Sequence, residues 1–134
     1  MKLALPVLLI AVIGASVFFS TRNDSTTQQI SANQPLTLEI IMNDISNGAT
    51  VVDVRTPSEY NTEHAVGSIN VPLQDMQSGE FGDLEKDQKI YVYCRSGNRS
   101  AQAAGLLRQA GYHNIIDIQS ISAWKELGGQ VEQS

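Results

Sequence analysis

Apolar residues recur with a helical period in two segments of the chain. Residues 38–45 and 103–110 each carry apolar side chains at positions i, i+3, i+4 and i+7, which places those side chains on one face of a helix. A glycine follows each segment, Gly48 or Gly111, as is common at the C-terminal end of a helix. A short helix is also predicted to begin at Pro57, because proline suits the first helical turn.

Short apolar runs rich in β-branched residues lie between these helices and predict strands. They are residues 50–54, 68–71, 89–93 and 114–118. Strands that are apolar throughout are typical of a parallel sheet covered on both faces. Residues 79–88 are polar and predict a loop, and residues 122–127 predict a short closing helix. The alternation of strands and helices predicts an α/β domain with an open parallel sheet.

The N-terminus has a different pattern from the rest of the chain. Lys2 precedes an apolar run over residues 3–19, and residues 21–33 are polar without a helix or strand period. We expect residues 1–20 to be a cleaved export signal or, since the run is close to the shortest bilayer span of about 17 residues, an uncleaved membrane anchor. Residues 21–33 are then a tether, and residues 34–132 a folded domain in the periplasm. Membrane contact is expected only through this N-terminal segment, if it is retained.

Charge and cysteine content restrict the chemistry available to the chain. The 9 Lys and Arg residues against 14 Asp and Glu residues give a net charge of -5, and no basic stripe is present, so nucleic-acid binding is not expected. With 1 cysteine and 2 distant histidines, neither an internal disulfide nor a metal site is expected. An exported domain with an odd cysteine either buries it or uses it chemically. The sequence predicts no particular oligomeric state.

The only cysteine, Cys94, lies at the end of the strongest predicted strand, where parallel α/β folds bind ligands. The residues that follow it are Arg95, Ser96, Gly97, Asn98 and Arg99. Gly97 and Asn98 tolerate positive φ, so the loop can turn its backbone N–H groups inward beside those of the next helix. Such a nest lowers the pKa of a thiol, and the two arginines can hold an anionic donor such as thiosulfate. This pattern predicts attack by Cys94 on the donor's outer sulfur to form a persulfide.

Other functions fit parts of the same pattern. Protein phosphatases use a Cys-x5-Arg loop, whereas this chain has 4 residues between Cys94 and Arg99, a smaller ring that suits a sulfur atom better than a phosphoryl group. A non-catalytic sulfur carrier or protein-interaction module would use the same loop. Redox sensing would suit an exposed thiol of low pKa. The simplest alternative is an inert buried cysteine followed by a solvated arginine.

Four motifs occur in a fixed order along the domain. They are residues 53–60 (DVRTPSEY), residues 64–72 (HAVGSINVP), the Cys-x-x-x-x-Arg loop of residues 94–99, and Ala123-Trp124 with Gly128-Gly129. Together they resemble the rhodanese family, and in particular its small exported members of the phage-shock type. The resemblance implies one rhodanese-like domain whose central parallel sheet has helices on both faces. It also implies a cofactor-free thiosulfate sulfurtransferase that passes sulfane sulfur through a Cys94 persulfide to cyanide or a thiol.

Asp53 and Arg55 end a predicted strand at the same edge of the sheet as Cys94. The resemblance implies that they support the site, and an ion pair with no role in turnover fits the sequence equally well. His64 is expected to be structural, because a thiolate of low pKa needs no general base. Trp124 is expected to lie in the core.

The chain departs from the family pattern at two places. Glu63 stands where the family often has glycine before the histidine of the second motif, and residues 119–120 are Gln-Ser where it often has Gly-Gly. Both places are expected to be turns that do not touch the Cys94 loop. The departures are therefore expected to alter substrate preference more than catalysis.

Overall fold

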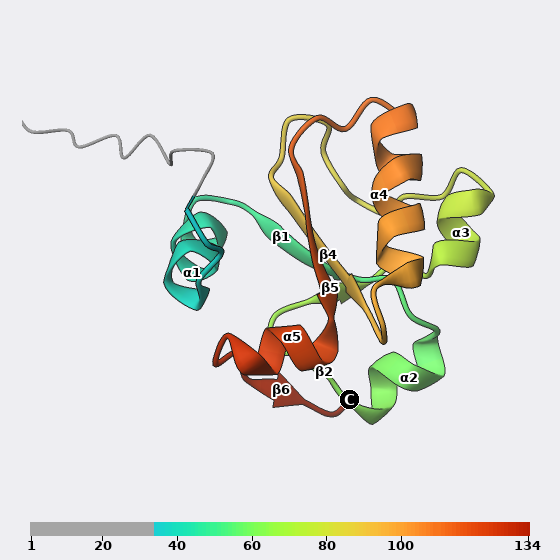
Figure 1. Cartoon of the computed structure of the whole chain (residues 1–134). Helices are drawn as coiled ribbons and strands as arrows, with labels where there is room; N and C mark the ends of the chain where they lie inside the picture. Colours follow the sequence, from blue (N-terminus) through green and yellow to red (C-terminus); the bar gives the residue numbers. More distant parts are fainter. Residues whose placement is uncertain (1–33) are drawn as a thin grey trace, which may run out of the picture. The chain divides into compact units, whose positions relative to one another are not determined.

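A sheet of four parallel strands, in the order β3-β1-β4-β5, forms the centre of the fold (Figure 1). In this computed structural model, which describes residues 34–134, the strands are β1 (Thr50–Asp53), β3 (Ile69–Asn70), β4 (Ile90–Cys94) and β5 (Ile115–Ser120). Strand β4 lies between β1 and β5, so Cys94 ends an interior strand. The predicted signal or anchor and the predicted tether lie outside the described residues.

Helices cover both faces of the sheet. On one face are α3 (Leu73–Gln77) and α4 (Asn98–Gln109), and on the other are α1 (Leu38–Ser46) and α5 (Ile121–Glu126). Side chains of β4 alternate between these layers, because successive strand residues point to opposite faces. Val92 and Cys94 pack with α3 and α4, whereas Tyr91 and Tyr93 pack with α1 and α5. All four side chains are fully buried.

Side-chain caps explain where several helices begin. Thr37 accepts a hydrogen bond from the Ile40 N–H at the start of α1, and Ser120 accepts one from the Ala123 N–H at the start of α5. The helix α2 (Pro57–Thr62) begins with a reciprocal capping box, in which cap and third-residue side chains bind each other's backbone N–H groups.

The predicted α/β class and parallel sheet are confirmed, and the predicted helices and strands are present. The prediction omitted α3, β2 (His64–Ala65) and β6 (Val131–Glu132), of which the last two pair antiparallel in a separate small sheet. Two-residue strands carry no detectable period, and α3 has only 5 residues and no side-chain cap. Within Gln34–Ser134, no helix is long and apolar enough to cross a membrane.

Candidate active site

The loop after Cys94 makes a sharp turn from β4 into α4. Gly97 occupies the N-cap position of α4 with a φ of 94° and no side-chain cap, a conformation that glycine adopts without strain. Asn98 is already the first residue of the helix. Of the two residues expected to tolerate positive φ, Gly97 adopts it and Asn98 does not.

The sulfur of Cys94 lies within a ring of donors made by this turn. The Gly97 N–H donates to Sγ over 3.0 Å, and the Ser100 hydroxyl lies 3.7 Å from Sγ. Burial raises the pKa of the Cys94 thiol, but hydrogen bonds from the N–H groups of Ser100, Ser96 and Gly97 and from the Ser100 hydroxyl lower it. The balance brings the pKa below the ordinary value of 9.0. The thiolate, which is the nucleophilic form, therefore forms at a lower pH than in an unperturbed cysteine, although the sulfur has no contact with solvent.

Cys94 has a relative exposure of 0%. The exposed thiol that a redox-sensing role would use is therefore contradicted by the structure, although the lowered pKa fits such a role. A substrate reaches the sulfur only if the groups around it shift. The groups that enclose Sγ within hydrogen-bonding distance include Gly97, Ser100 and the carbonyl of Gln119.

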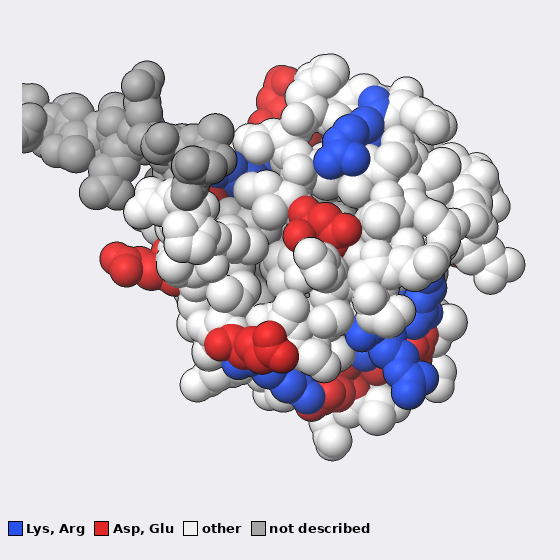
Figure 2. Space-filling view, in the orientation of Figure 1, with Lys and Arg blue, Asp and Glu red and all other residues white. Residues whose placement is uncertain are grey.

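The two arginines of the loop differ in their surroundings. Arg99 donates two hydrogen bonds to the Glu59 carboxylate, at 2.7 and 2.8 Å. In the space-filling view, acidic and basic side chains lie side by side over α2 and the start of α4, where this pair is formed (Figure 2). Arg95 is exposed and forms no ion pair with any residue of the described domain. Arg95 is thus available to an anionic donor, whereas the charge of Arg99 is already partly neutralised.

The contact with Glu59 changes the titration of both partners. Hydrogen bonds from Arg99 lower the pKa of Glu59 to about 2, although partial burial opposes the change. Hydrogen bonding to Glu59 raises the pKa of Arg99, and the negative charge of the Cys94 thiolate raises it further. Arg99 therefore ties the loop to α2 through Glu59.

Asp53 and Arg55 form a buried ion pair at the end of β1. The Arg55 Nε donates to both carboxylate oxygens of Asp53, at 2.9 and 3.0 Å, and its guanidinium also binds the Glu63 carbonyl oxygen. The side-chain amide of Asn70 donates to the carbonyl oxygens of Asp53 and Arg55. The pair lies at the same sheet edge as Cys94 but has no hydrogen bond to its sulfur, so its observed contacts are those of structural support.

His64 is buried and stacks on the Tyr60 ring at a centroid distance of 3.8 Å. Its Nδ1 lies 2.8 Å from the Tyr60 carbonyl oxygen, and its Nε2 lies 3.5 Å from Glu132. These contacts agree with the structural role predicted for this histidine. Trp124 is buried against the core, as predicted.

The expectation that residues 119–120 do not touch the Cys94 loop is wrong. The Gln119 carbonyl oxygen lies 3.4 Å from Cys94 Sγ and accepts a hydrogen bond from the Ser100 hydroxyl at 3.2 Å. Ser120 pairs with Cys94 in the ladder between β4 and β5. Both residues belong to β5 rather than to a turn, and the parallel sheet brings its carboxyl end beside that of β4. Glu63 is the C-cap residue that follows α2, and it forms an ion pair with Lys125 at 2.6 Å.

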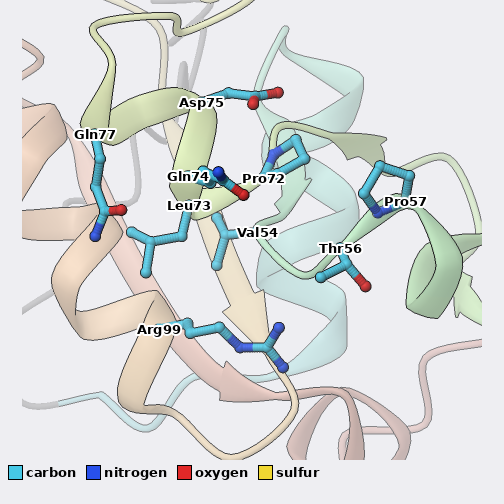
Figure 3. A pocket seen from close by; sticks show the side chains of 9 residues that line it. All are labelled: Val54, Thr56, Pro57, Pro72, Leu73, Gln74, Asp75, Gln77 and Arg99. Carbon is cyan, nitrogen blue, oxygen red and sulfur yellow. The ribbon is translucent and has the colours of Figure 1, made fainter.

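An open pocket of about 540 Å³ adjoins the loop on the side of β1 and β3 (Figure 3). It is lined by Val54, Thr56, Pro57, Pro72, Leu73, Gln74, Asp75, Gln77 and Arg99. Arg99 is the only residue of the Cys94 loop in this lining. Gln119 approaches the sulfur from the other side, because it belongs to β5, which flanks β4 opposite β1. No group of three or more possible ligand side chains that could hold a metal ion occurs within residues 34–134.

Three residues at the site were not among the predicted ones: Glu59, Ser100 and Gln119. The spacing of Thr56 and Glu59 is a capping-box signal, which could have located Glu59 at the start of α2 but not its partner Arg99. Ser100 directly follows the loop arginine, and its distance from the sulfur depends on the turn at Gly97. The sequence marks Gln119 only as a departure from the family pattern.

The Rhodanese-like domain family matches residues 37–127 of the chain, which therefore belongs to the rhodanese-like family. The resemblance carried by the four sequence motifs is thereby confirmed. Adenylyltransferase and sulfurtransferase uba4 of Ogataea parapolymorpha is 40% identical over 68 residues, which is 51% of this chain and 18% of that protein. Thiosulfate sulfurtransferase PspE of Escherichia coli is 35% identical over 65 residues, which is 48% of this chain and 62% of that protein. The chain thus spans less than two thirds of either relative.

Solved structures agree with the family assignment. The crystal structure of a rhodanese-related protein from Thermoplasma volcanium matches with a TM-score of 0.61 and 34% sequence identity, covering 75% of this chain and 99% of that one. The parallel sheet with helices on both faces is therefore the fold of rhodanese-like domains, and relatives of this chain include sulfurtransferases.

Proposed function

We propose that this chain is a thiosulfate sulfurtransferase that carries sulfane sulfur on Cys94. The observation that carries the proposal is the ring of donors around Sγ, in which the Gly97 N–H lies 3.0 Å from the sulfur and the pKa of a fully buried thiol is lowered. A persulfide is itself anionic, so the same N–H groups suit the product of the first step as well as the thiolate. The similarity to a thiosulfate sulfurtransferase supports thiosulfate as the donor.

The first step is a displacement at sulfur. The Cys94 thiolate attacks the outer sulfur of thiosulfate, a new S–S bond forms to Sγ, and the S–S bond of thiosulfate breaks. Sulfite leaves with the electron pair of that bond, and the persulfide keeps the single negative charge of the thiolate. The exposed guanidinium of Arg95 suits the sulfonate end of the donor, because an arginine fork matches an oxyanion.

The second step returns the enzyme to its starting state. Cyanide attacks the outer sulfur of the persulfide, the S–S bond breaks, and Cys94 leaves as the thiolate while thiocyanate is released. A thiolate acceptor reacts in the same way and becomes a persulfide. Neither step changes the number of protons on the protein, so no general base is required, in keeping with the structural contacts of His64.

Turnover with thiosulfate and cyanide tests this proposal, with Cys94→Ser as the matched variant. We expect the chain to form thiocyanate and the variant to form none while remaining folded. If the folded chain takes up sulfur but releases none to cyanide or thiols, its function is that of a sulfur carrier and not of an enzyme. A folded chain that takes up no sulfur would refute both functions, and phosphatase substrates would then be the next to test.

Export of the domain to the periplasm is a separate part of the proposal. It is supported by the positive residue Lys2 and the apolar run over residues 3–19, the order found in export signals. We expect the chain to be recovered from the periplasm or the inner membrane of a bacterial host, and a variant lacking residues 1–20 to stay in the cytoplasm. The mass of the recovered protein distinguishes a cleaved signal from a retained anchor. Cytoplasmic recovery of the intact chain would contradict export.

A further inference from the structure

Gln119 has an unfavourable backbone conformation directly against the sulfur. Its φ is 80°, and it is the only residue other than glycine with a positive φ among residues 34–134. A long side chain is strained at such a φ, and strain of this kind persists only where the surrounding structure holds the residue in place. Functional sites are common locations for such residues.

Contacts from two elements hold Gln119 in this conformation. Its N–H donates to the Asp117 Oδ1 at 2.7 Å, and its carbonyl oxygen accepts from the Ser100 hydroxyl at 3.2 Å. The ladder between β4 and β5 also shifts its register just before Gln119 pairs with Tyr93. The conformation is therefore built by β5 and α4 together.

In this position Gln119 covers part of the loop around the sulfur. Its carbonyl oxygen lies 3.4 Å from Cys94 Sγ. A β-carbon added to Gly97 would lie 3.3 Å from the Cβ of Gln119 and 3.9 Å from its Cγ, so the Gln119 side chain lies against the residue whose N–H binds the sulfur. Among the groups within hydrogen-bonding distance of Sγ in the described domain, Gln119 alone lies outside residues 94–100.

We propose that Gln119 is a specificity-determining residue that narrows access to Cys94, so that small sulfur donors reach the sulfur and bulky ones do not. Since Cys94 is fully buried, a reagent has to displace one of the groups that enclose it. The side chain of Gln119 adds bulk at the edge of the loop formed by Gly97. The choice of donors rests on the proposed sulfur-transfer function, but access to the thiol can be measured without turnover.

Alkylation of Cys94 in the full chain measures this access, with iodoacetamide as the small reagent and N-phenylmaleimide as the bulky one. The variants are Gln119→Gly and Gln119→Asn. Glycine and asparagine both tolerate positive φ, so both relieve the strain, but only glycine removes the side chain. Both variants are therefore expected to unfold at a temperature equal to or above that of the unaltered chain.

We expect N-phenylmaleimide to react at least about tenfold faster with Gln119→Gly than with the unaltered chain, since a single methylene in a pocket changes discrimination by about 10- to 200-fold. Iodoacetamide should gain much less, and Gln119→Asn, whose side chain is one methylene shorter, should gain clearly less than Gln119→Gly. The pH midpoint of alkylation should stay the same in all three chains, because the backbone groups around Sγ remain.

The same variants extend the test to sulfur donors. The ratio of kcat/KM for benzenethiosulfonate to that for thiosulfate should rise in Gln119→Gly and rise clearly less in Gln119→Asn. An unchanged N-phenylmaleimide rate in Gln119→Gly would overturn the inference, and so would an equal gain in Gln119→Asn, which would assign the effect to relaxed backbone strain. If the alkylation selectivity changes but none of the chains transfers sulfur, the role of Gln119 in access is supported and the proposed sulfur-transfer function fails.

Discussion

Two arginine–carboxylate pairs lie at the carboxyl edge of the sheet, and they differ in burial and in the elements that they join. The side chains of Asp53 and Arg55 are 0% and 7% exposed, and both residues lie at the end of β1. The side chains of Glu59 and Arg99 are 29% and 30% exposed, and they join α2 to α4. The first pair maintains the end of a strand, whereas the second connects the Cys94 loop to a neighbouring helix.

The difference in burial separates the expected roles of the two pairs. Removing one partner of a buried pair leaves a charge without solvent, which typically costs about 3–5 kcal/mol. A partly exposed pair contributes about 0–1 kcal/mol, because solvent screens it. We therefore expect the stability of the fold to depend on Asp53 and Arg55, and the rate of sulfur transfer to depend on Glu59 and Arg99.

Asp53→Asn is expected to have the largest effect on stability. The substitution leaves the Arg55 guanidinium buried without its counter-charge, so the free energy of unfolding should fall by about 3–5 kcal/mol. Urea unfolding measures the loss, and Asp83→Asn, which removes an exposed carboxylate, is the control for the change in net charge. A loss no larger than that of the control would show that this pair does not stabilise the end of β1.

Glu59→Gln should have the opposite effect: a small loss of stability and a large loss of activity. Glutamine at position 59 can still complete the capping box of α2. The substitution therefore mainly removes the negative charge that faces Arg99. Since small displacements of reacting groups can reduce rates by about a hundredfold, we expect kcat to fall by about ten- to a hundredfold. The control is Glu63→Gln, which removes the partner of Lys125 away from the loop. Equal kcat values in the two variants would contradict the positioning role of Glu59.

Thr56→Ala tests the cap without removing the ion pair. The Thr56 hydroxyl lies 3.3 Å from the Glu59 N–H, which donates to it, and losing such a cap costs about 0.5–2 kcal/mol. The loss of kcat should be smaller than in Glu59→Gln, because the carboxylate still binds Arg99. Steady-state kinetics beside thermal unfolding measures both effects. If kcat falls as much as in Glu59→Gln, the activity depends on the placement of the whole helix α2 and not on the Glu59–Arg99 ion pair.

The smallest expected effect is an acid-dependent loss of stability, which stays small although the pKa shift is large, because solvent screens a pair whose side chains are 29% and 30% exposed. The pKa of Glu59 is about 2 in the folded chain against an ordinary value of 4.5. Its lowered pKa therefore contributes stability that is fully present above pH 4.5 and is lost as the pH falls to about 2. The difference in unfolding free energy between the chain and Glu59→Gln, measured across this range, should shrink toward zero at the acid end. A difference that is constant with pH would contradict the ion pair.

The sequence predicted the central sheet well because its strands are apolar throughout. The segments around Val52, Val92 and Ile118 pack helices on both faces, which leaves a clear signal in the sequence. The small antiparallel sheet was missed because His64 and Ala65 pair with only two residues near the C-terminus. A pairing of that length gives no period, and only the folded chain brings its two strands together.

The site was predicted in part, and the missing part depends on contacts between distant elements. The loop from Cys94 to Arg99 is continuous in sequence, so its residue types and spacing could be interpreted directly. The partner of Arg99 lies on α2, and Gln119 meets Cys94 only because β4 and β5 are neighbours in the sheet. A single sequence contains no spacing rule that links these residues.

The most direct test of the account is the intact mass of the chain after treatment with thiosulfate, followed by location of the added sulfur in peptides. We predict a gain of one sulfur atom on Cys94, lost on addition of cyanide and absent in Cys94→Ser. The gain should already occur below pH 9.0, the ordinary pKa of a thiol, because the loop lowers the pKa of Cys94. A folded chain that gains no sulfur at any pH, or gains it equally in Cys94→Ser, would contradict persulfide formation at this site.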